Sequence, residues 1–339
     1  MKKVFLTGAG GFIGKYLTKY LIKNGYEVHG LFTDSEMAKK KRVNPKLKVY
    51  CSNLLEYEEM GMILKNVDPD FIIHLAARTE VEKSFYDPIS FSEINYCGTV
   101  NLIEKARELK NLKLFLFSST METYGWSPES DFVKRDDTKN LRPFTEHTAQ
   151  HPNAPYAVAK LGCEKYLEYV GRSFDFPFCA LRQTNTYGRW DNDFFVVEQI
   201  ITQMLKLKKK DEPNEINLGY DKPYRNLLFI DDLIDLYGVV LKNYEKASGE
   251  MFCTGPDNAL SIKDLVDKIA SKLRWTGKVN WNKKPARPGE IYYLNSSHAK
   301  VERVLGWSPK TGLNEGLDKA IKIWKDNLKK TNELAYRYR

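Results

Sequence analysis

The sequence predicts an α/β fold built on a doubly wound parallel sheet, and three observations lead to this prediction. A short apolar strand at the N-terminus runs directly into a glycine-rich turn at Thr7 to Gly14. Apolar runs of strand length then alternate with amphipathic helical runs through the first half of the chain. Polar or small residues follow the end of each predicted strand, which is where open parallel sheets bind their ligands.

The first strand, Val4-Phe5-Leu6, leads into Thr7-Gly8-Ala9-Gly10-Gly11-Phe12-Ile13-Gly14, and a helical pattern follows as far as Asn24-Gly25. The spacing Gly-x-x-Gly-x-x-Gly between a strand and a helix predicts a dinucleotide site. Gly8, Gly11 and Gly14 allow a tight turn, and the helix start, with Phe12 and Ile13, offers backbone amides to a pyrophosphate. A purely structural glycine-rich turn is the alternative, and the strand–loop–helix context disfavours it.

The second predicted strand, Glu27 to Phe32, indicates which cofactor binds. An acidic residue at its end would hydrogen-bond the adenosine ribose and select NAD. Phe32 stands at that place, and Asp34 two residues later could serve instead and repel a 2′-phosphate. The basic cluster Lys39 to Arg42 argues against this choice of NAD. We therefore predict NAD and leave NADP open.

Three more strands are predicted at Leu47 to Cys51, Phe71 to Leu75 and Leu112 to Phe117, with a helix at Asn95 to Leu109. The polar or small residues at the strand ends are Asn53-Leu54, Ala76-Ala77 and Ser118-Ser119-Thr120. Because parallel strands end at one edge of the sheet, these groups should meet at one site.

Tyr156 and Lys160 are the candidate proton-transfer pair. Residues four apart lie on one face of a helix, so the phenol and the ammonium can share a site. A neighbouring cation favours the phenolate, so we expect the pKa of Tyr156 to fall from about 10 toward working pH. Tyr156 could then accept the proton of a sugar or alcohol hydroxyl. The spacing is common on surface helices, and the glycine loop is what makes it informative.

Composition excludes several classes of protein. The 339 residues are 42% hydrophobic, which is ample for a packed core, and no run approaches the roughly 20 apolar residues that span a bilayer. With no signal peptide evident, we expect a soluble, cytoplasmic protein. The formal charge of +9 comes from dispersed lysines with short clusters at Lys39 to Arg42 and Lys208 to Lys210. This distribution favours a basic surface or an anionic small molecule over nucleic acid.

Cysteine and histidine usage predicts neither disulfides nor a metal site. The five cysteines, Cys51, Cys97, Cys163, Cys179 and Cys253, are widely spaced and read as reduced core residues. His147 and His151 are four apart, but Pro152 follows at once and no third ligand is evident, so we expect a loop.

Together these motifs resemble the extended short-chain dehydrogenase/reductase superfamily, and specifically its NAD-dependent nucleotide-sugar epimerase/dehydratase family. The resemblance extends to about Trp307. Besides the glycine loop and the Tyr-Lys pair, the matching segments are His74 to Ala77, Asn95 to Thr99, Ser118 to Gly125, Arg182 to Gly188, Tyr224 to Asp232 and Arg287 to Glu290. Asn53 and Asn226 stand where relatives usually carry Asp, and Met121 where they carry Asp or Ser.

The resemblance implies a role for each matched residue. The implied catalytic residues are Thr120, Glu122, Tyr156 and Lys160. The implied cofactor-binding residues are Gly8, Gly11, Phe12, Ile13, Gly14, Asp34, Asn53, Leu54, Leu75, Ala76, Ala77, Asn95, Tyr156 and Lys160. The implied substrate-binding residues are Thr79, Thr120, Met121, Asn185, Arg189, Arg225 and Arg287. The substrate is a nucleotide-diphosphate sugar, whose diphosphate suits the guanidinium groups of two arginines.

The resemblance also implies a reaction. Tightly bound NAD oxidises the sugar at C4 while Tyr156 takes the hydroxyl proton, Thr120 hydrogen-bonds the same oxygen and Lys160 orients the site. Glu122 stands where similar dehydratases carry the base for the C5 proton, but Met121 beside it cannot protonate a leaving hydroxyl. We predict a dehydratase of the 4,6-type or a 5,6-variant. A 4-epimerase and a non-catalytic NAD-binding sensor are the alternatives.

By the same resemblance, residues 1–182 form the Rossmann-like cofactor domain, which also receives about 227–249. Residues 183–226 and 250–328 form a smaller mixed α/β substrate lobe, with amphipathic helices at Asp264 to Trp275 and Leu313 to Leu328. Residues 329–339 are predicted to fray. A homodimer is implied, with Ile94 to Leu109 and Tyr156 to Arg172 as the candidate interface helices.

Overall fold

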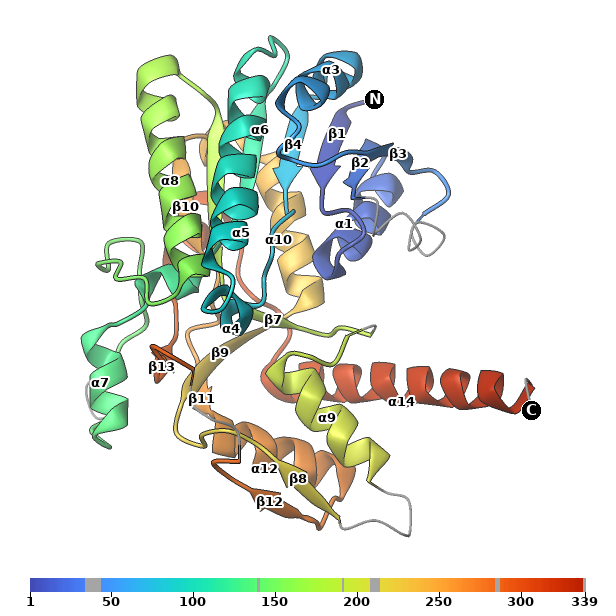
Figure 1. Ribbon diagram of the computed structural model, residues 1–339, viewed down its shortest axis with the longest axis vertical. Coiled ribbons are helices and arrows are strands. Elements are labelled where there is room, and N and C mark those ends of the chain that lie inside the picture. The colour runs from blue at the N-terminus through green and yellow to red at the C-terminus, as the bar shows by residue number, and fades with distance from the viewer. Residues whose placement is uncertain (34–43, 139–140, 191, 208–213, 284–286, 338–339) are drawn as a thin grey trace.

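The structure is a computed structural model that describes residues 1–33, 44–138, 141–190, 192–207, 214–283 and 287–337. Asp34, the cluster Lys39 to Arg42 and the cluster Lys208 to Lys210 lie outside the described residues. The described chain forms a parallel sheet covered by helices on both faces, with a smaller lobe beneath it (Figure 1). The predicted fold class is confirmed.

The large sheet has seven strands in the order β10-β6-β5-β4-β1-β2-β3, and every pair is parallel. Its strands are β1 (Lys3–Thr7), β2 (Glu27–Phe32), β3 (Lys48–Cys51), β4 (Phe71–His74), β5 (Leu114–Thr120), β6 (Phe178–Gln183) and β10 (Glu250–Cys253). The central strands are continuously apolar because helices bury both of their faces. The strand order reverses between β1 and β4, so the loops after these two strands open a crevice where a ligand can bind.

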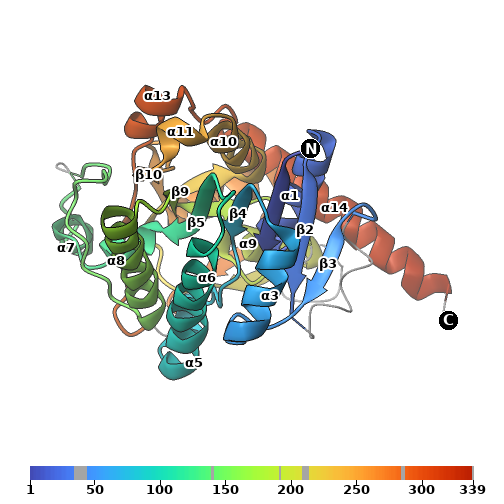
Figure 2. The same cartoon turned by 90° about the horizontal axis from the view of Figure 1, so that it is seen from above.

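Helices cover the two faces of the sheet in separate groups (Figure 2). One group contains α1 (Phe12–Lys23) and α10 (Ile230–Lys242), and the other contains α3 (Tyr57–Val67), α6 (Gly98–Arg107) and α8 (Pro155–Phe174). The shorter helices are α4 (Val81–Ser84), α5 (Pro88–Ser92), the π-helix η2 (Glu93–Cys97), the 3₁₀ helix η3 (Met121–Tyr124), α7 (Pro128–Lys134), α11 (Tyr244–Ala247) and α13 (Ala299–Leu305).

The lobe is a small mixed α/β unit centred on strand β9 (Tyr224–Phe229). Its other elements are β7 (Asn185–Tyr187), β8 (Glu215–Asn217), β11 (Ala259–Ser261), β12 (Lys278–Asn280), β13 (Tyr293–Leu294), α9 (Val196–Lys206), α12 (Ile262–Leu273) and α14 (Leu313–Arg337). β9 pairs in parallel with β7 and β13 and antiparallel with β11, and β8 pairs with β12.

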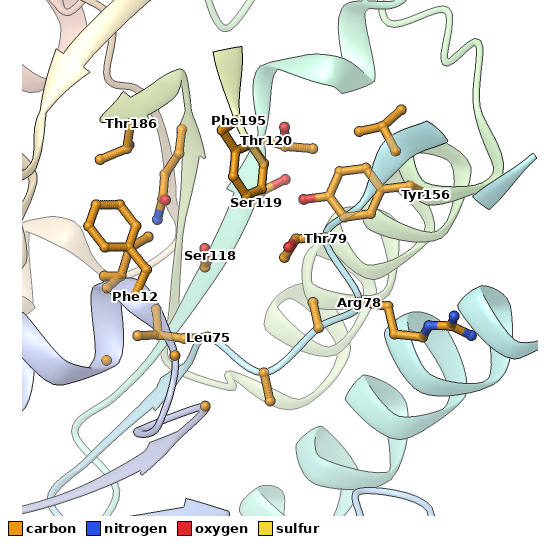
Figure 3. A pocket seen from close by; sticks show the side chains of 18 of the residues that line it. Phe12, Leu75, Arg78, Thr79, Ser118, Ser119, Thr120, Tyr156, Thr186 and Phe195 are labelled. Carbon is orange, nitrogen blue, oxygen red and sulfur yellow. The ribbon is translucent and has the colours of Figure 1, made fainter. Parts of the chain in front are cut away.

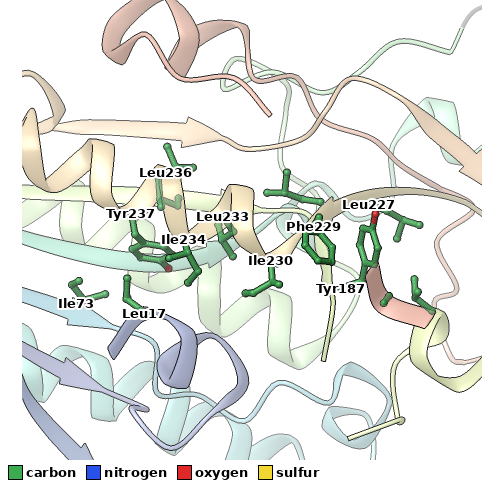
Figure 4. Packing of buried hydrophobic residues seen from close by; sticks show 14 of the residues in the cluster. Leu17, Ile73, Tyr187, Leu227, Phe229, Ile230, Leu233, Ile234, Leu236 and Tyr237 are labelled. Carbon is green, nitrogen blue, oxygen red and sulfur yellow. The ribbon is translucent and has the colours of Figure 1, made fainter. Parts of the chain in front are cut away.

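One apolar core joins the lobe to the cofactor domain. Strand β9 passes directly into α10, so Phe229 packs in the lobe while Leu233 packs near Leu17 of α1 (Figure 4). Tyr187 of β7 meets Phe229 edge-on at 5.4 Å between ring centroids. Because the two units share buried side chains across this junction, the lobe is held in a defined position relative to the large sheet.

The structure corrects several details of the prediction. Strand β10, predicted in the lobe, is the edge strand of the large sheet, and α13 packs on it. Conversely, β9 belongs to the lobe sheet although the chain was expected to rejoin the cofactor domain near Leu227. Helix α14 continues to Arg337, where a frayed tail was predicted. All five cysteines are free thiols, but Cys97 is exposed and so is not a core residue.

The close packing of the glycine loop yields a first prediction. A Cβ at Gly14 would lie 2.2 Å from the carbonyl oxygen of Gly8 and 2.8 Å from the Cα of Ala9, both backbone atoms that cannot swing away. Gly14→Ala should therefore lower the free energy of unfolding by about 1–3 kcal/mol and weaken NAD binding. Urea unfolding and cofactor titration measure both effects. Gly219→Ala, which has open space around the new Cβ, is the matched control, and equal behaviour of the two variants would contradict the prediction.

Candidate active site

A cavity of about 600 Å³ lies at the carboxyl ends of the central strands and is closed from below by the lobe. It runs from the glycine loop to the Tyr156 end of α8 (Figure 3). The predicted site residues that line it are Gly8, Gly11, Phe12, Ile13, Gly14, Asn53, Leu54, Leu75, Ala76, Ala77, Thr79, Thr120, Met121, Glu122, Tyr156, Asn185 and Arg189. Lys160, Asn95, Arg225 and Arg287 are not among its lining residues.

The glycine-loop end of the cavity is suited to an anion. Helix α1 begins after Gly11 with no side-chain cap and no acidic residue in its first turn, so its first amide groups are left for a ligand. Gly8 has φ +68°, and a Cβ there would lie 2.9 Å from the Ala76 nitrogen. A bound pyrophosphate can therefore approach this backbone closely, and the residues present fit a dinucleotide.

The buried side chain of His74 helps to fix the position of the loop that follows β4. The Thr99 hydroxyl donates to the Asn95 carbonyl at 2.7 Å, so the Nε2–H of His74 donates to Thr99 at 2.9 Å. His74 Nδ1 must then accept from the Thr7 hydroxyl at 2.7 Å. The Thr7 oxygen in turn accepts the backbone N–H groups of Leu75 and Ala76 at 3.2 and 3.1 Å. A neutral imidazole thus connects β1, β4 and the cavity wall.

Asn95 holds the next segment of the cavity wall, at Arg78, through two hydrogen bonds. Its side-chain oxygen accepts the Arg78 backbone N–H at 2.8 Å, and its amide donates to the Arg78 carbonyl at 2.9 Å. Asn95 lies in the π-helix η2, a rare local geometry that often occurs at functional sites. Its contacts fix the backbone beside Thr79, so its role in the described structure is positional.

Tyr156 faces the end of β5 from helix α8. Its phenol points across the cavity toward Ser119 and Thr120, and the Thr120 side chain hydrogen-bonds it (Figure 3). Lys160, one turn along, donates from Nζ to the Ser118 carbonyl at 2.8 Å. The structure therefore brings Thr120 and Tyr156 together, while Lys160 is held on the Ser118 carbonyl and does not line the cavity.

The expected lowering of the Tyr156 pKa is wrong for the structure. Burial raises the pKa of Tyr156 above its ordinary value, and the Glu122 charge adds to this, while the Thr120 hydrogen bond only partly offsets it. Burial also lowers the pKa of Lys160 to about 8. The sequence could not show this because spacing fixes neighbours but not their desolvation. Tyr156 is thus a neutral hydrogen-bond donor at neutral pH.

Glu122 is the distinctive group at the reacting end of the cavity. Its Oε2 atom is buried and has no hydrogen-bond partner among the described residues. Met121 beside it is 1% exposed and packs with the apolar cluster that contains Tyr124 and Phe144. The other carboxylate lining the cavity is Glu198, whose Oε1 accepts the backbone N–H groups of Gly188 and Arg189 at the lobe end. Its Oε2 atom is likewise buried without a partner among the described residues, so the two carboxylates differ in place and not in this respect.

The two arginines expected to bind a diphosphate lie together in the lobe. Glu290 bridges them, with N–O distances of 3.1 Å to Arg225 and 2.9 Å to Arg287. The Glu122 charge acts on both guanidinium groups, which places the cluster beside the reacting end of the cavity. The neighbouring departure, Asn226, is also explained: its amide donates to the Asn258 carbonyl at 2.9 Å, which a carboxylate could not do.

Sequence reasoning placed Asn185 and Arg189 on the lobe side of the cavity but missed the residues around the start of α9. Phe195, Val196, Val197 and Glu198 line it from the start of α9. The Arg189 guanidinium lies 4.2 Å from the Phe12 ring and 3.7 Å from the Phe195 ring, and so joins the glycine loop to the lobe. No motif marks these α9 residues, because their spacing is that of any amphipathic helix.

No group of three or more His, Cys, Asp or Glu side chains in the described part of the chain could hold a metal ion. His147 and His151 lie in the loop before α8, as expected. No helix within the described ranges is both long enough and apolar enough to cross a membrane.

The parallel sheet, the glycine loop and the Thr-Tyr-Lys constellation define a Rossmann-fold protein with a nucleotide site and a proton-transfer site in one cavity. Residues 5–320 match the family model described as GDP-mannose 4,6 dehydratase. The chain belongs to the NAD-dependent nucleotide-sugar epimerase/dehydratase family of the extended short-chain dehydrogenase/reductase superfamily, and it is an enzyme of that family.

Relatives with different reactions are about equally similar to this chain. The dTDP-glucose 4,6-dehydratase of Salmonella typhimurium is 27% identical over 98% of this chain and 95% of its own length. The crystal structure of UDP-glucose 4-epimerase with UDP-glucose from Thermotoga maritima is 26% identical, with a TM-score of 0.85 over 96% of this chain and 99% of that one. UDP-glucuronic acid 4-epimerase from Bacillus cereus, crystallised with UDP-glucuronic acid and NAD, is 25% identical, with a TM-score of 0.81 over 96% and 99%.

The buried imidazole predicts how stability depends on pH. Burial holds the pKa of His74 well below its usual 6.5, and burial also lowers the pKa of His29. Below about pH 6.5 the unfolded chain takes up protons that the folded chain does not bind, so stability falls as pH falls. Each such histidine contributes a slope of up to about 1.4 kcal/mol per pH unit.

Urea unfolding of the protein and of His74→Gln between about pH 7.5 and pH 5.5 measures this slope. The variant should be less stable at the higher pH and show a shallower slope. Parallel slopes in the two proteins would contradict the neutral, buried state of His74.

Proposed function

We propose that the protein is a nucleotide-diphosphate-sugar dehydratase that works with bound NAD, oxidising the sugar at C4 before water is lost from C5 and C6. The observation that supports this proposal best is the buried, unpartnered Oε2 of Glu122 beside Thr120 and Tyr156. An unpaired buried carboxylate costs stability, so its retention in a reaction cavity indicates a role in chemistry. Epimerisation at C4 needs no base at C5.

NAD suits the glycine-loop end of the cavity, with Gly8, Gly11 and Gly14 around the pyrophosphate and Asn53 and Leu54 along the wall. The family uses NAD or NADP, and the B. cereus relative was crystallised with NAD. When bound, the cofactor supplies the hydride acceptor for C4. Arg225 and Arg287 are the proposed partners of the substrate diphosphate.

Three side chains serve the C4 oxygen in this proposal. Thr120 and Tyr156 hydrogen-bond it. Tyr156, once it has lost its own proton to solvent, takes the hydroxyl proton as the phenolate during oxidation and returns it when a C4 alcohol forms again. Because burial opposes the phenolate, the transfer needs a compensating positive charge near Tyr156. Lys160 lies one turn away on the same helix and is held on the Ser118 carbonyl in the structure.

Glu122 then carries out the elimination. A ketone at C4 acidifies the C5 proton, which Glu122 removes; the C–H electron pair forms the new double bond as the C6–oxygen bond breaks. Met121 can donate no proton, and Glu198 is held at the other end of the cavity. We therefore propose that the carboxylic acid formed at Glu122 passes its proton to the leaving hydroxyl, which departs as water. Return of the hydride to C6, with a solvent proton delivered to C5 and the Tyr156 proton released to solvent, gives the 4,6-reaction. Return of the hydride to C4, with the Tyr156 proton going back to the C4 oxygen, gives the 5,6-variant.

A 4-epimerase is the second candidate. The specific observation in its favour is Met121, because an epimerase needs no acid at that position. In that case Glu122 has only a structural role. A non-catalytic NAD-binding sensor is disfavoured because such a protein would not need the assembled Thr120, Tyr156 and Lys160.

Mass spectrometry of a panel of UDP-, GDP-, CDP- and dTDP-sugars after incubation with the enzyme and NAD tests the proposal. A product lighter by one water is expected. Glu122→Gln should reduce its formation by about 10²-fold or more while C4 oxidation still occurs, seen as transient absorbance of reduced nicotinamide. Tyr156→Phe, which should bind NAD but not turn over, is the blank.

An epimerised sugar of unchanged mass would establish the second candidate. Water loss at the wild-type rate in Glu122→Gln would remove Glu122 from the mechanism.

We also propose that the protein is a homodimer joined through the outer face of α5, α6 and α8, the last two being the predicted interface helices. Ile89 on α5 and Val158 and Tyr169 on α8 are 72%, 56% and 50% exposed, although α5 and α8 are in contact. Exposed apolar side chains gathered on adjoining helices are typical of interfaces.

Light scattering should give twice the monomer mass for the wild-type protein, and Val158→Glu should shift it toward monomer without loss of fold. Met62→Glu, a similar change on α3, is the control because Met62 is also exposed but lies off this face. A wild-type monomer at micromolar concentration would contradict the dimer.

A further inference from the structure

A buried ion pair lies directly behind the reacting end of the cavity. Arg182 of β6 and Glu164 of α8 are 3% and 0% exposed, and their closest N–O distance is 2.9 Å. Arg182 donates to Glu164 from Nε and from Nη2. Gln150 bridges the pair, accepting from Arg182 at 3.2 Å and donating to Glu164 at 3.0 Å. Neither charged side chain has an unpaired buried polar atom.

Glu164 holds the start of the segment that carries Glu122. The Ser119 hydroxyl donates to Glu164 Oε1 at 2.5 Å. The next residue, Thr120, caps η3, with its hydroxyl accepting the Glu122 backbone N–H at 3.2 Å. Glu164 therefore fixes the strand end from which this short helix begins.

Arg182 holds the other end of η3. Its Nη1 donates to the Tyr124 hydroxyl at 3.0 Å and to the Glu146 carbonyl at 3.2 Å. The Tyr124 hydroxyl in turn donates to the Thr145 carbonyl at 2.9 Å. Tyr124 is the last residue of η3, two positions after Glu122. The two ends of this four-residue helix are thus bound by the two members of one ion pair.

We propose that Glu164 and Arg182 are positioning residues that fix the direction of the Glu122 carboxylate relative to Thr120 and Tyr156. The inference rests on the role of Glu122 in the proposed function. A single turn of 3₁₀ helix has poor hydrogen-bond geometry and little stability of its own. It keeps a defined orientation because both of its ends are tied to the sheet and to α8.

All the donors of Arg182 are used in this arrangement. Arg182 is saturated by Glu164, Gln150, Tyr124 and the Glu146 carbonyl, and so has no donor left for a second carboxylate. Replacing a buried ion pair by apolar residues of similar volume is often neutral for stability. The pair is therefore better explained by the orientation it imposes than by the energy it contributes.

Tyr124→Phe tests the proposal, because it removes the hydroxyl that Arg182 holds and leaves the ion pair and the ring packing in place. Hydrogen exchange of peptides covering residues 121–125 should become faster, while exchange of α8 should not change. The kcat for water loss should fall about tenfold or more with little change in KM, while reduced nicotinamide accumulates because C4 oxidation is unaffected. Tyr166→Phe on the outer face of α8, which loses one hydrogen bond to Glu104, is the matched control.

The charge-free double variant Glu164→Leu/Arg182→Met should show the same faster exchange and the same selective loss of elimination. Wild-type exchange and wild-type water loss in Tyr124→Phe would overturn the proposal. The exchange measurement requires no turnover, so it judges the positioning role even if the wild-type enzyme proves to be an epimerase. If the double variant does not fold, Tyr124→Phe decides the question alone.

Discussion

Helix α8 is held against strand β5 by three side chains spaced one turn apart, and the whole site depends on this attachment. Tyr156 meets Thr120, Lys160 binds the Ser118 carbonyl, and Glu164 binds the Ser119 hydroxyl. Each helical turn thus fixes one residue of the strand end. Because the acid–base groups come from both elements, this attachment sets their distances more directly than any contact within either element does.

The buried charges are also arranged by contacts within the chain. Three buried or half-buried cations are paired within the chain: Arg182 with Glu164, and Arg225 and Arg287 with Glu290. Glu122 alone among these carboxylates keeps an unpartnered oxygen among the described residues. In the proposed mechanism Glu122 is the base, and Arg225 and Arg287 are paired with Glu290 rather than with it.

The sequence was sufficient for the fold class and for the secondary-structure elements that carry Thr120, Tyr156 and Lys160, because strand–loop–helix order and one-turn spacing are local properties. It could not show which partners are buried together. It therefore failed for the pKa of Tyr156, which depends on desolvation, and for the place of β10, which depends on sheet pairing. It also failed for Phe195 and Glu198, whose helix acquires a function only when the lobe packs under the glycine loop. Glu164 and Arg182 lie on different elements, and no local sequence pattern predicts that they form an ion pair.

Following the C4 hydrogen tests the central claim most directly, and it requires a nucleotide sugar deuterated at C4. We predict a product that has lost one water and carries the deuterium at C6 for the 4,6-reaction, or at C4 for the 5,6-variant. In D₂O the wild-type enzyme should give a 4,6-product that carries solvent deuterium at C5, or a 5,6-product with no hydrogen at C5, whereas Glu122→Gln should form little of either. A product of unchanged mass that keeps its deuterium at C4 with inverted configuration would contradict the account. Glu122 would then be a structural residue in a 4-epimerase.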